Sequence, residues 1–228
     1  MQERYVVIGG VAAGMSAASR IRKSDPGSSV VVLEQGEHIS YSACSMPYYI
    51  ADPEMSVEEL KVLSLEDARQ KRGIDIRIRH RAIRIDAGKR VVQAVDLESG
   101  NETSIPYDRL VIATGARPVP LGVPGEDLPH VYSLRTLDDG MAIKQALAVG
   151  KVKSAVILGG GYIGLEMCEA LRQRGVAVTL VSRRPVPMAD MDDHITKVIV
   201  QALHDNNVRY VSERPVLQIS EKAVQLEG

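Results

Sequence analysis

Two glycine-rich turns, each flanked by an apolar strand and a helix, constrain the fold of this chain more than any other feature. The first turn, at residues 9–14, follows an apolar stretch at 5–8 and leads into a helical stretch from about residue 12 to 23. A second apolar stretch at 30–33 then ends at Glu34. This is a β-α-β unit of about 30 residues, the length that one parallel crossover needs.

The same pattern of strand, glycine turn and helix recurs later in the chain, where Gly159 corresponds to Gly9. An apolar stretch at 155–158 precedes the turn, a helix is expected over 162–174, and Gly175 fits its C-terminal stop. A further strand is expected over 176–181. Two such units predict an α/β fold of two Rossmann-like nucleotide-binding domains, at 1–125 and, incompletely, at 150–228.

Between the two units the pattern changes to short strands. Residues 64–72 are expected to form a helix with Ser64 as its N-cap. Residues 74–79 alternate apolar and polar side chains, as a half-exposed strand does, and we expect a small β insertion over about 74–105. Residues 117–129 carry four prolines and two glycines, which is typical of a connection between domains.

Charge and cysteine content exclude several classes. The 228 residues hold 28 Lys+Arg against 29 Asp+Glu, so there is no basic footprint for nucleic acid or for an anionic membrane surface. No apolar run approaches the roughly 20 residues that span a bilayer, and no signal peptide is evident, so we expect a cytoplasmic protein. Two cysteines are too few for a disulfide scaffold or a structural zinc site, and no metal site is expected.

The first glycine turn matches the dinucleotide fingerprint except at its third position, which is Val11. Gly9 still allows the tight turn, and Gly14 still lets the helix approach the strand. The helix N-terminus offers free N–H groups and a partial positive charge to a pyrophosphate. Glu34 stands where a carboxylate can bond a ribose hydroxyl. The alternative is a glycine turn of the kind that any α/β protein contains.

The second turn carries glycine at all three fingerprint positions. The acid expected after its second strand is replaced by Ser182, Arg183 and Arg184. Arginine attracts a ribose 2′-phosphate, so this favours NADP, although two arginines also suit a solvated strand end. Two dinucleotide sites indicate a flavin and a nicotinamide that exchange a hydride.

The two cysteines have different surroundings. Cys44 follows the first β-α-β unit and has no CxxC partner. A helix beginning near it would favour the thiolate, but a buried core cysteine fits the spacing equally well. Cys168 lies within the second expected helix and is interpreted as a small buried apolar residue.

Together, in this order, the motifs resemble the pyridine nucleotide–disulfide oxidoreductases that use FAD and a single active-site cysteine. The resemblance rests on GGVAAG, Glu34, YSACSMPYY, ATGARP and GGGYIGLE, which span nearly the whole chain. Within that family the chain is most similar to the coenzyme A–disulfide reductases. NADH peroxidases carry a histidine base at the position of Ala12, which counts against peroxide chemistry.

The resemblance implies a ligand for each group of residues. Cys44 would be the redox residue. FAD contacts would come from Gly9, Gly10, Val11, Ala12, Ala13, Gly14, Glu34, Thr114 and Gly115. Nicotinamide cofactor contacts would come from Gly159, Gly161, Tyr162, Ile163, Gly164, Glu166, Ser182, Arg183 and Arg184. Coenzyme A contacts would come from Ser16, Arg20, Lys23, Ser40, Ala43 and Arg72.

Two features qualify the coenzyme A contacts. Ala43 departs from the asparagine that the family favours. The basic members of the set form a cluster suited to several phosphates, but each basic residue equally fits a solvated face.

The implied activity is the FAD-dependent reduction of coenzyme A disulfide, or a related small disulfide or persulfide, by NADPH, with NADH possible. Family members are longer and dimerise through a C-terminal domain, so we expect a homodimer of the full-length form and a fragment or truncated product here. One alternative is an NADH oxidase in which Cys44 cycles through sulfenic acid. Another is a non-catalytic nucleotide-binding fragment.

Overall fold

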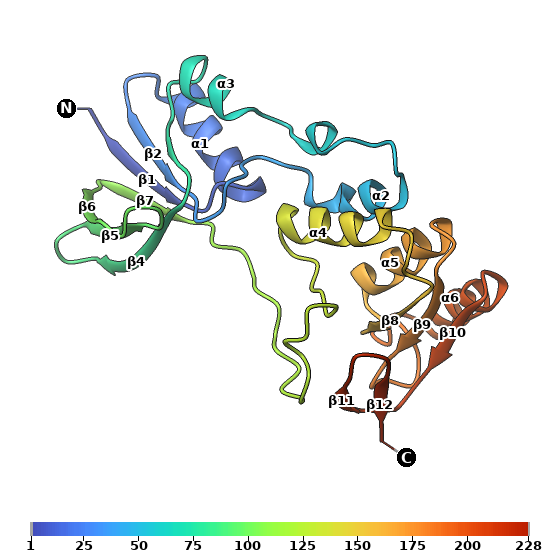
Figure 1. The fold of residues 1–228 in the computed structure, drawn as a ribbon. Helices are drawn as coiled ribbons and strands as arrows, with labels where there is room; N and C mark the ends of the chain where they lie inside the picture. Colours follow the sequence, from blue (N-terminus) through green and yellow to red (C-terminus); the bar gives the residue numbers. More distant parts are fainter. Residues whose placement is uncertain (1, 228) are drawn as a thin grey trace. The chain divides into compact units, whose positions relative to one another are not determined.

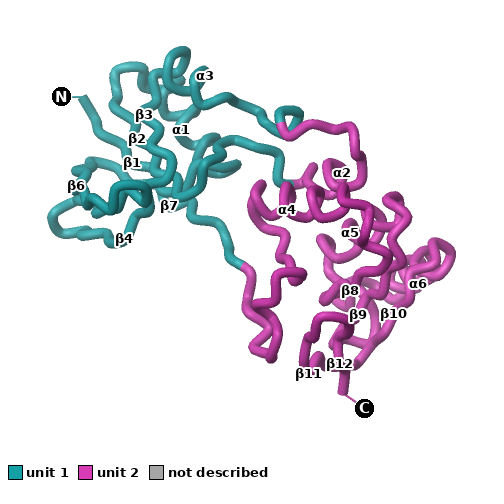
Figure 2. The backbone as a smooth tube through the Cα atoms, in the orientation of Figure 1, with its two compact units in different colours: residues 1–43, 58–117 teal, residues 44–57, 118–228 magenta. Residues whose placement is uncertain are grey.

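The computed structural model describes residues 2–227, which form two compact units (Figures 1 and 2). Unit 1 contains the chain up to Ala43 and the segment Glu58–Arg117. Unit 2 contains Cys44–Val57 and the chain from Pro118 onward. The segment that carries Cys44 therefore folds with the second glycine turn, a division that differs from the two sequential domains expected from the sequence.

Unit 1 is built on a parallel sheet of four strands in the order β3-β2-β1-β7. The strands are β1 (Arg4–Ile8), β2 (Ser29–Leu33), β3 (Asp75–Arg77) and β7 (Arg109–Ile112). The crossover from β1 to β2 is α1 (Ala12–Ser24), as the sequence predicts. A shorter helix, α3 (Leu65–Gln70), is capped by Ser64, whose Oγ accepts the Asp67 N–H at 3.0 Å.

Both faces of this sheet are covered, which explains its unbroken apolar strands. Side chains alternate between the faces along each strand. Val7, Val30 and Val32 pack with residues of α1 and α3. Val6, Ile8 and Leu33 pack on the other face, against an antiparallel sheet. Its strands, in spatial order, are β4 (His80–Asp86), β5 (Val91–Asp96) and β6 (Glu102–Pro106).

The antiparallel insertion starts later than the sequence indicates. Ile74 and Ile76 are buried beside α1, so their alternation marks an edge strand of the parallel sheet rather than the start of the insertion. Arg79 then turns the chain with a φ of +55°, and its N–H donates to the carbonyl of Gly36 at 3.0 Å. The insertion accordingly begins at His80.

Unit 2 contains a parallel sheet of three strands in the order β10-β9-β8. The strands are β8 (Ser154–Leu158), β9 (Ala177–Val181) and β10 (Val208–Val211), joined by the helices α5 (Tyr162–Gln173) and α6 (Asp193–Asp205). Smaller elements of this unit are the helices α2 (Met46–Ala51) and α4 (Leu137–Ala148), and the hairpin β11 (Val216–Ile219) and β12 (Val224–Leu226). Two 3₁₀ turns, η1 (Ala43–Ser45) and η2 (Val57–Leu60), span the residues at which the chain passes from one unit to the other.

The helix α4 was missed by the sequence analysis, although its start carries a readable signal. Thr136 Oγ1 accepts the Asp139 N–H, and the Asp139 carboxylate accepts the Thr136 N–H at 2.7 Å, which makes a capping box. Inside α4, a Cβ at Gly140 would lie in ordinary contact with the sulfur of Met46, at 3.5 Å, so this part of α4 lies against α2.

The proline-rich stretch is an ordered part of unit 2. The carbonyl of Pro124 accepts the N–H of Ile219 in β11 at 2.9 Å. A Cβ at Gly125 would lie 1.9 Å from the Ile219 carbonyl oxygen, so only glycine fits there. The predicted connection therefore contacts β11 at Pro124 and Gly125.

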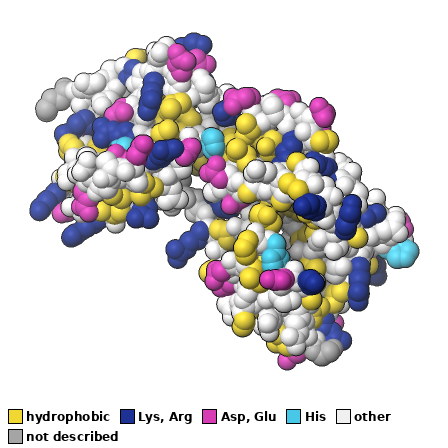
Figure 3. All heavy atoms as spheres, viewed as in Figure 1, with side chains coloured by type: hydrophobic (Ala, Val, Ile, Leu, Met, Phe, Trp, Pro, Cys, Tyr) yellow, Lys and Arg dark blue, Asp and Glu magenta, His cyan; other side chains and the backbone are white. Residues whose placement is uncertain are grey.

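The surface has mixed charge. Lys and Arg side chains are interspersed with Asp and Glu on the face drawn in Figure 3. Among the helices of residues 2–227, none combines the length and apolarity needed to cross a bilayer.

We predict that Gly14→Ala destabilises the chain by about 1–3 kcal/mol, because the added methyl has no room. An ideal Cβ at Gly14 would lie 1.7 Å from the Gly9 carbonyl oxygen. Gly88→Ala is the matched control, since its Cβ would meet only the Asp86 carboxylate at 3.6 Å. Urea denaturation followed by circular dichroism measures both variants. Equal stability of the two variants would contradict the packing argument.

Candidate functional site

The residues predicted to bind FAD meet at the carboxyl edge of the unit 1 sheet. Gly9 follows β1, Glu34 follows β2, and Thr114 and Gly115 follow β7. A Cβ on Gly9, whose φ is +106°, would lie 2.2 Å from the carbonyl oxygen of Ala113. The chain leaving β7 thus passes directly against the glycine turn. This edge is where ligands bind in sheets of this type.

The turn presents backbone donors rather than side chains. Helix α1 begins at Ala12 with Val11 as N-cap, and no side chain caps it. Ala12 and Ala13 are exposed, whereas Gly14 is buried against Gly9. The first N–H groups of a helix have no intrahelical acceptor, so they are available to a pyrophosphate.

Glu34 is held in place by the same turn. Its side chain is buried and accepts the N–H of Gly10 at 2.6 Å and the N–H of Gly36 at 2.7 Å. A carboxylate has about four acceptor sites, so two remain for the hydroxyls of a ribose. The close glycine turn, the uncapped helix and the fixed carboxylate together fit the ADP part of a dinucleotide.

A hollow of about 790 Å³ lies beside α1 in unit 1. Five of the six residues predicted to contact coenzyme A line it: Ser16, Arg20, Lys23, Ser40 and Arg72. Ala43, the sixth, does not. Two further lining residues, Ser19 and Lys71, were missed by the sequence analysis. Each of them precedes a predicted contact residue, Arg20 or Arg72, and this adjacency in the sequence could have identified them.

The cations of this groove differ in their bonding. Arg72 donates to Ser19 Oγ at 2.7 Å, and Lys71 pairs with Asp67 at 2.8 Å. Within residues 2–227, Arg20 and Lys23 are exposed and form no ion pair. These two side chains leave uncompensated positive charge at the groove, which suits a phosphorylated ligand.

Ser40 joins the groove to the glycine turn. Its φ of +45° lies in the left-handed region, which is uncommon for residues other than glycine. Its N–H donates to the Gly10 carbonyl at 2.9 Å, and its carbonyl accepts the N–H of Val62 at 2.8 Å. The strained residue is therefore fixed from both sides.

The two cysteines have opposite environments. Cys44 lies in η1 and is exposed, so the structure excludes the alternative of a buried core cysteine at this position. The next helix, α2, begins two residues later at Met46. Cys168 is buried in α5, as expected, and burial raises the pKa of its thiol to about 12. Such a thiol is almost entirely protonated at neutral pH.

The second glycine turn repeats the geometry of the first. Gly161 is the N-cap of α5 and no side chain caps the helix. A Cβ at Gly164 would lie 2.0 Å from the Gly159 carbonyl oxygen. At the start of α5, Tyr162 and Ile163 are exposed at 65% and 55%, and Glu166 is also exposed. Their side chains are accessible to a ligand.

The two arginines that follow β9 differ in whether they form an ion pair. Ser182 is buried, and its Oγ accepts the N–H of Arg184 at 3.1 Å. The Arg184 guanidinium pairs with Asp190 at 2.5 Å. Arg183 is exposed and makes no ion pair among the described residues. A phosphate could reach Arg183 directly, whereas it would compete with Asp190 for Arg184.

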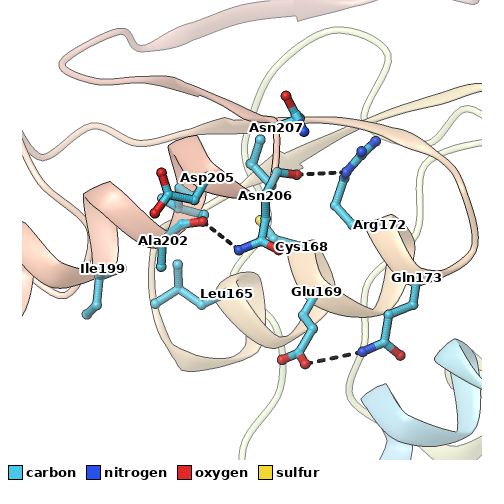
Figure 4. Close-up of a pocket in the computed structure, with 12 residues that line it drawn as sticks. Leu165, Cys168, Glu169, Arg172, Gln173, Ile199, Ala202, Asp205, Asn206 and Asn207 are labelled. Carbon is cyan, nitrogen blue, oxygen red and sulfur yellow. Dashed lines mark hydrogen bonds between the residues drawn. The ribbon is translucent and has the colours of Figure 1, made fainter.

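Another hollow, of about 670 Å³, lies between α5 and α6 (Figure 4). Cys168 lines it, and Arg172 of α5 donates to the Asn206 carbonyl at 3.0 Å. None of the predicted cofactor residues lines this hollow. It is therefore separate from the second glycine turn.

Several curated relatives match nearly the whole chain. An "NADH oxidase" of Methanocaldococcus jannaschii is 33% identical over 99% of this chain. An "NAD(P)H sulfur oxidoreductase (CoA-dependent)" of Pyrococcus furiosus is 36% identical over 100% of the chain. A "Coenzyme A disulfide reductase" of Staphylococcus haemolyticus is 28% identical over 99%. The chain spans about half the length of these relatives, at 51%, 49% and 50% respectively.

Solved structures share the fold closely. The reduced CoADR-RHD of Bacillus anthracis aligns over 100% of this chain and 41% of its own, with a TM-score of 0.95 and 30% identity. An engineered water-forming NADPH oxidase bound to NADPH aligns over 98% of this chain and 50% of its own, with a TM-score of 0.91 and 27% identity. The substitutions that distinguish this oxidase from its parent enzyme remove an aspartate and introduce two arginines and a serine.

The sequence pattern of one family matches residues 3–227, nearly the whole chain. The family match, the two glycine turns and the close structural likenesses agree with one another. The chain belongs to the pyridine nucleotide-disulphide oxidoreductase family.

Proposed function

We propose that the whole protein is a homodimeric NAD(P)H-dependent reductase of small disulfides or persulfides, with Cys44 as its redox residue. The observation that carries this proposal is the exposure of Cys44 in a chain whose other cysteine is buried. Because the pKa of the Cys168 thiol is raised to about 12, Cys44 is the better nucleophile of the two. FAD, which the family uses and the first glycine turn fits, supplies a two-electron relay when bound.

The chemistry at Cys44 is a thiol–disulfide exchange. The Cys44 thiolate attacks one sulfur of the substrate, forms a mixed disulfide and releases the other half as a thiolate, which takes up a proton. Two electrons from NAD(P)H then cleave the mixed disulfide, which restores the Cys44 thiolate and releases the second thiol on protonation. A lone cysteine can cycle in this way because the partner sulfur belongs to the substrate.

Coenzyme A disulfide, or the persulfide of coenzyme A, is the substrate class we favour. The groove beside α1 carries Arg20 and Lys23 without ion-pair partners among the described residues, and coenzyme A bears several phosphates. Relatives named as coenzyme A disulfide reductase and as CoA-dependent sulfur oxidoreductase support the same choice.

We propose NADPH as the preferred nicotinamide cofactor. Ser182 replaces the acid that would bond a free ribose and repel a phosphate. Arg183 is exposed beside it, and the engineered NADPH oxidase gained arginine and serine while losing aspartate. These observations support a 2′-phosphate contact by Arg183 first and by Arg184 second.

An NADH oxidase is the second candidate, because a relative with that name matches 99% of the chain. In that reaction Cys44 would form a sulfenic acid, with oxygen as the electron acceptor. Oxygen consumption by a full-length form without any disulfide present distinguishes the two activities.

We predict that Cys44→Ser in a full-length form abolishes disulfide reduction, because a serine hydroxyl cannot form the mixed disulfide. Bound flavin should remain, and Cys168→Ala should keep full activity as the matched control. Turnover is followed as disulfide-dependent NAD(P)H oxidation, and flavin as its visible absorption. Retained turnover in Cys44→Ser would overturn the assignment of the redox residue.

We predict that Arg20→Ala with Lys23→Ala weakens binding of coenzyme A to this chain about tenfold, because two exposed cations lose their phosphate contacts. The loss should shrink at high salt, which screens such contacts. Lys89→Ala, in the turn after β4, is the control for a surface cation away from the groove. Calorimetric titration measures all three dissociation constants, and an unchanged value for the double variant would exclude this groove.

We predict that a full-length form prefers NADPH over NADH by about ten- to hundredfold in kcat/KM, the effect of one charge-assisted contact. Ser182→Glu with Arg183→Ala should abolish or reverse the preference. Arg184→Ala should reduce it less, because this side chain is already paired with Asp190. A wild type that prefers NADH would refute the assignment.

A further inference from the structure

A lysine of α4 is hydrogen-bonded to the segment that follows Cys44. Lys144 of α4 donates from Nζ to the carbonyl of Asp52, the C-cap of α2, at 2.7 Å. The same ammonium donates to the carbonyl of Met55 at 2.5 Å. The last carbonyls of a helix lack intrahelical donors, and Lys144 supplies a charged one.

Lys144 also contacts an aromatic ring of α2. Its Nζ lies 4.1 Å from the centroid of the Tyr49 ring. Tyr49 is only 7% exposed, so the cation–π contact is partly desolvated and correspondingly stronger. The ammonium is thus held by two carbonyls and one ring of the Cys44 segment.

A second cation reaches α2 from another helix. Arg174, the C-cap of α5, donates from its guanidinium to the carbonyl of Ile50 at 3.2 Å. Ile50 is fully buried, so this contact ties a core residue of α2 to α5. Helix α5 carries the second glycine turn at its other end.

The helix α2 depends on such contacts because it has only six residues. Isolated helices of this length are unstable in water. Met46, Tyr49 and Ile50 are buried, and Cys44 lies two residues before the helix begins. Any shift of α2 therefore moves the thiol.

We infer that Lys144 and Arg174 are positioning residues for Cys44, acting through the carboxyl end of α2. The inference rests on the proposed role of Cys44 as the redox residue. Removing either cation leaves the thiol chemically intact but allows the segment to open. The disulfide step is then slowed, whereas the nicotinamide site keeps its own residues.

The first test uses the 228-residue chain and hydrogen–deuterium exchange of residues 44–57. Lys144→Met keeps the length of the side chain but removes its donors and charge. Exchange should accelerate about ten- to hundredfold, the effect of losing charge-assisted hydrogen bonds. Lys144→Arg can still donate to carbonyls and lie over Tyr49, so it should restore most of the protection. Lys197→Met, on an exposed position of α6, is the control and should leave this segment unchanged.

The second test measures alkylation of the Cys44 peptide by iodoacetamide as a function of pH. Lys144→Met and Arg174→Met should change the dependence of the Cys44 alkylation rate on pH. Lys144→Arg and Lys197→Met should show the same dependence as the wild type. Arg174→Met removes only one hydrogen bond, so it decides the question if Lys144→Met does not fold. Unchanged exchange and unchanged alkylation in a folded variant would overturn the inference.

The third test separates this inference from the proposed function. In a full-length form, Lys144→Met should lower kcat for the disulfide about tenfold, because the charge-assisted hydrogen bonds that hold the Cys44 segment are lost, and should leave KM for NAD(P)H unchanged. A wild type that reduces no disulfide, but shows the expected exchange pattern, refutes the function and not the positioning. A wild type that reduces disulfides, with kcat unchanged in Lys144→Met, refutes the positioning alone.

Discussion

The close approach between the first and sixth positions of each glycine turn is the contact on which both proposed nucleotide sites depend. A side chain at Gly14 or Gly164 would overlap the carbonyl oxygen of Gly9 or Gly159. With hydrogen alone at these positions, each helix starts directly behind its strand, and its uncapped N–H groups point to the sheet edge. The rest of each site is arranged around that fixed helix start, including Glu34 after β2 and Ser182 after β9.

The basic residues of this chain fall into two groups, those already bonded to protein partners and those that are exposed without an ion-pair partner among the described residues. Arg22, Arg72 and Lys144 donate to partners within their own unit and hold segments together. Arg20 and Arg183 have exposed guanidinium groups without an ion-pair partner among residues 2–227. An unpaired exposed cation can bind an anion without first breaking another contact, so the second group is the better choice for phosphate binding. This is also why Arg184, paired with Asp190, ranks behind Arg183.

The path of the chain gives Cys44 an unexpected setting. The polypeptide enters unit 2 at Cys44 and leaves it after Val57, so a segment from the N-terminal half folds against α4 and α5. Ser40, four residues earlier, remains bonded to the first glycine turn. The chain therefore passes from unit 1 to unit 2 between Ala43 and Cys44. Lys144 of α4 and Arg174 at the end of α5, both far along the sequence, form hydrogen bonds to the segment that carries Cys44.

The sequence by itself determined both β-α-β units, the Ser64 cap and the glycines that each turn requires, because these depend on local periodicity and on residues that few alternatives can replace. Through the family resemblance it also singled out five of the residues that line the groove beside α1. Only the tertiary structure decided which cysteine is exposed, which arginine is already paired, and that β3 joins the parallel sheet. Those properties depend on contacts between residues far apart in the chain, such as Lys144 with Asp52 and Arg174 with Ile50, and local patterns carry no record of such contacts.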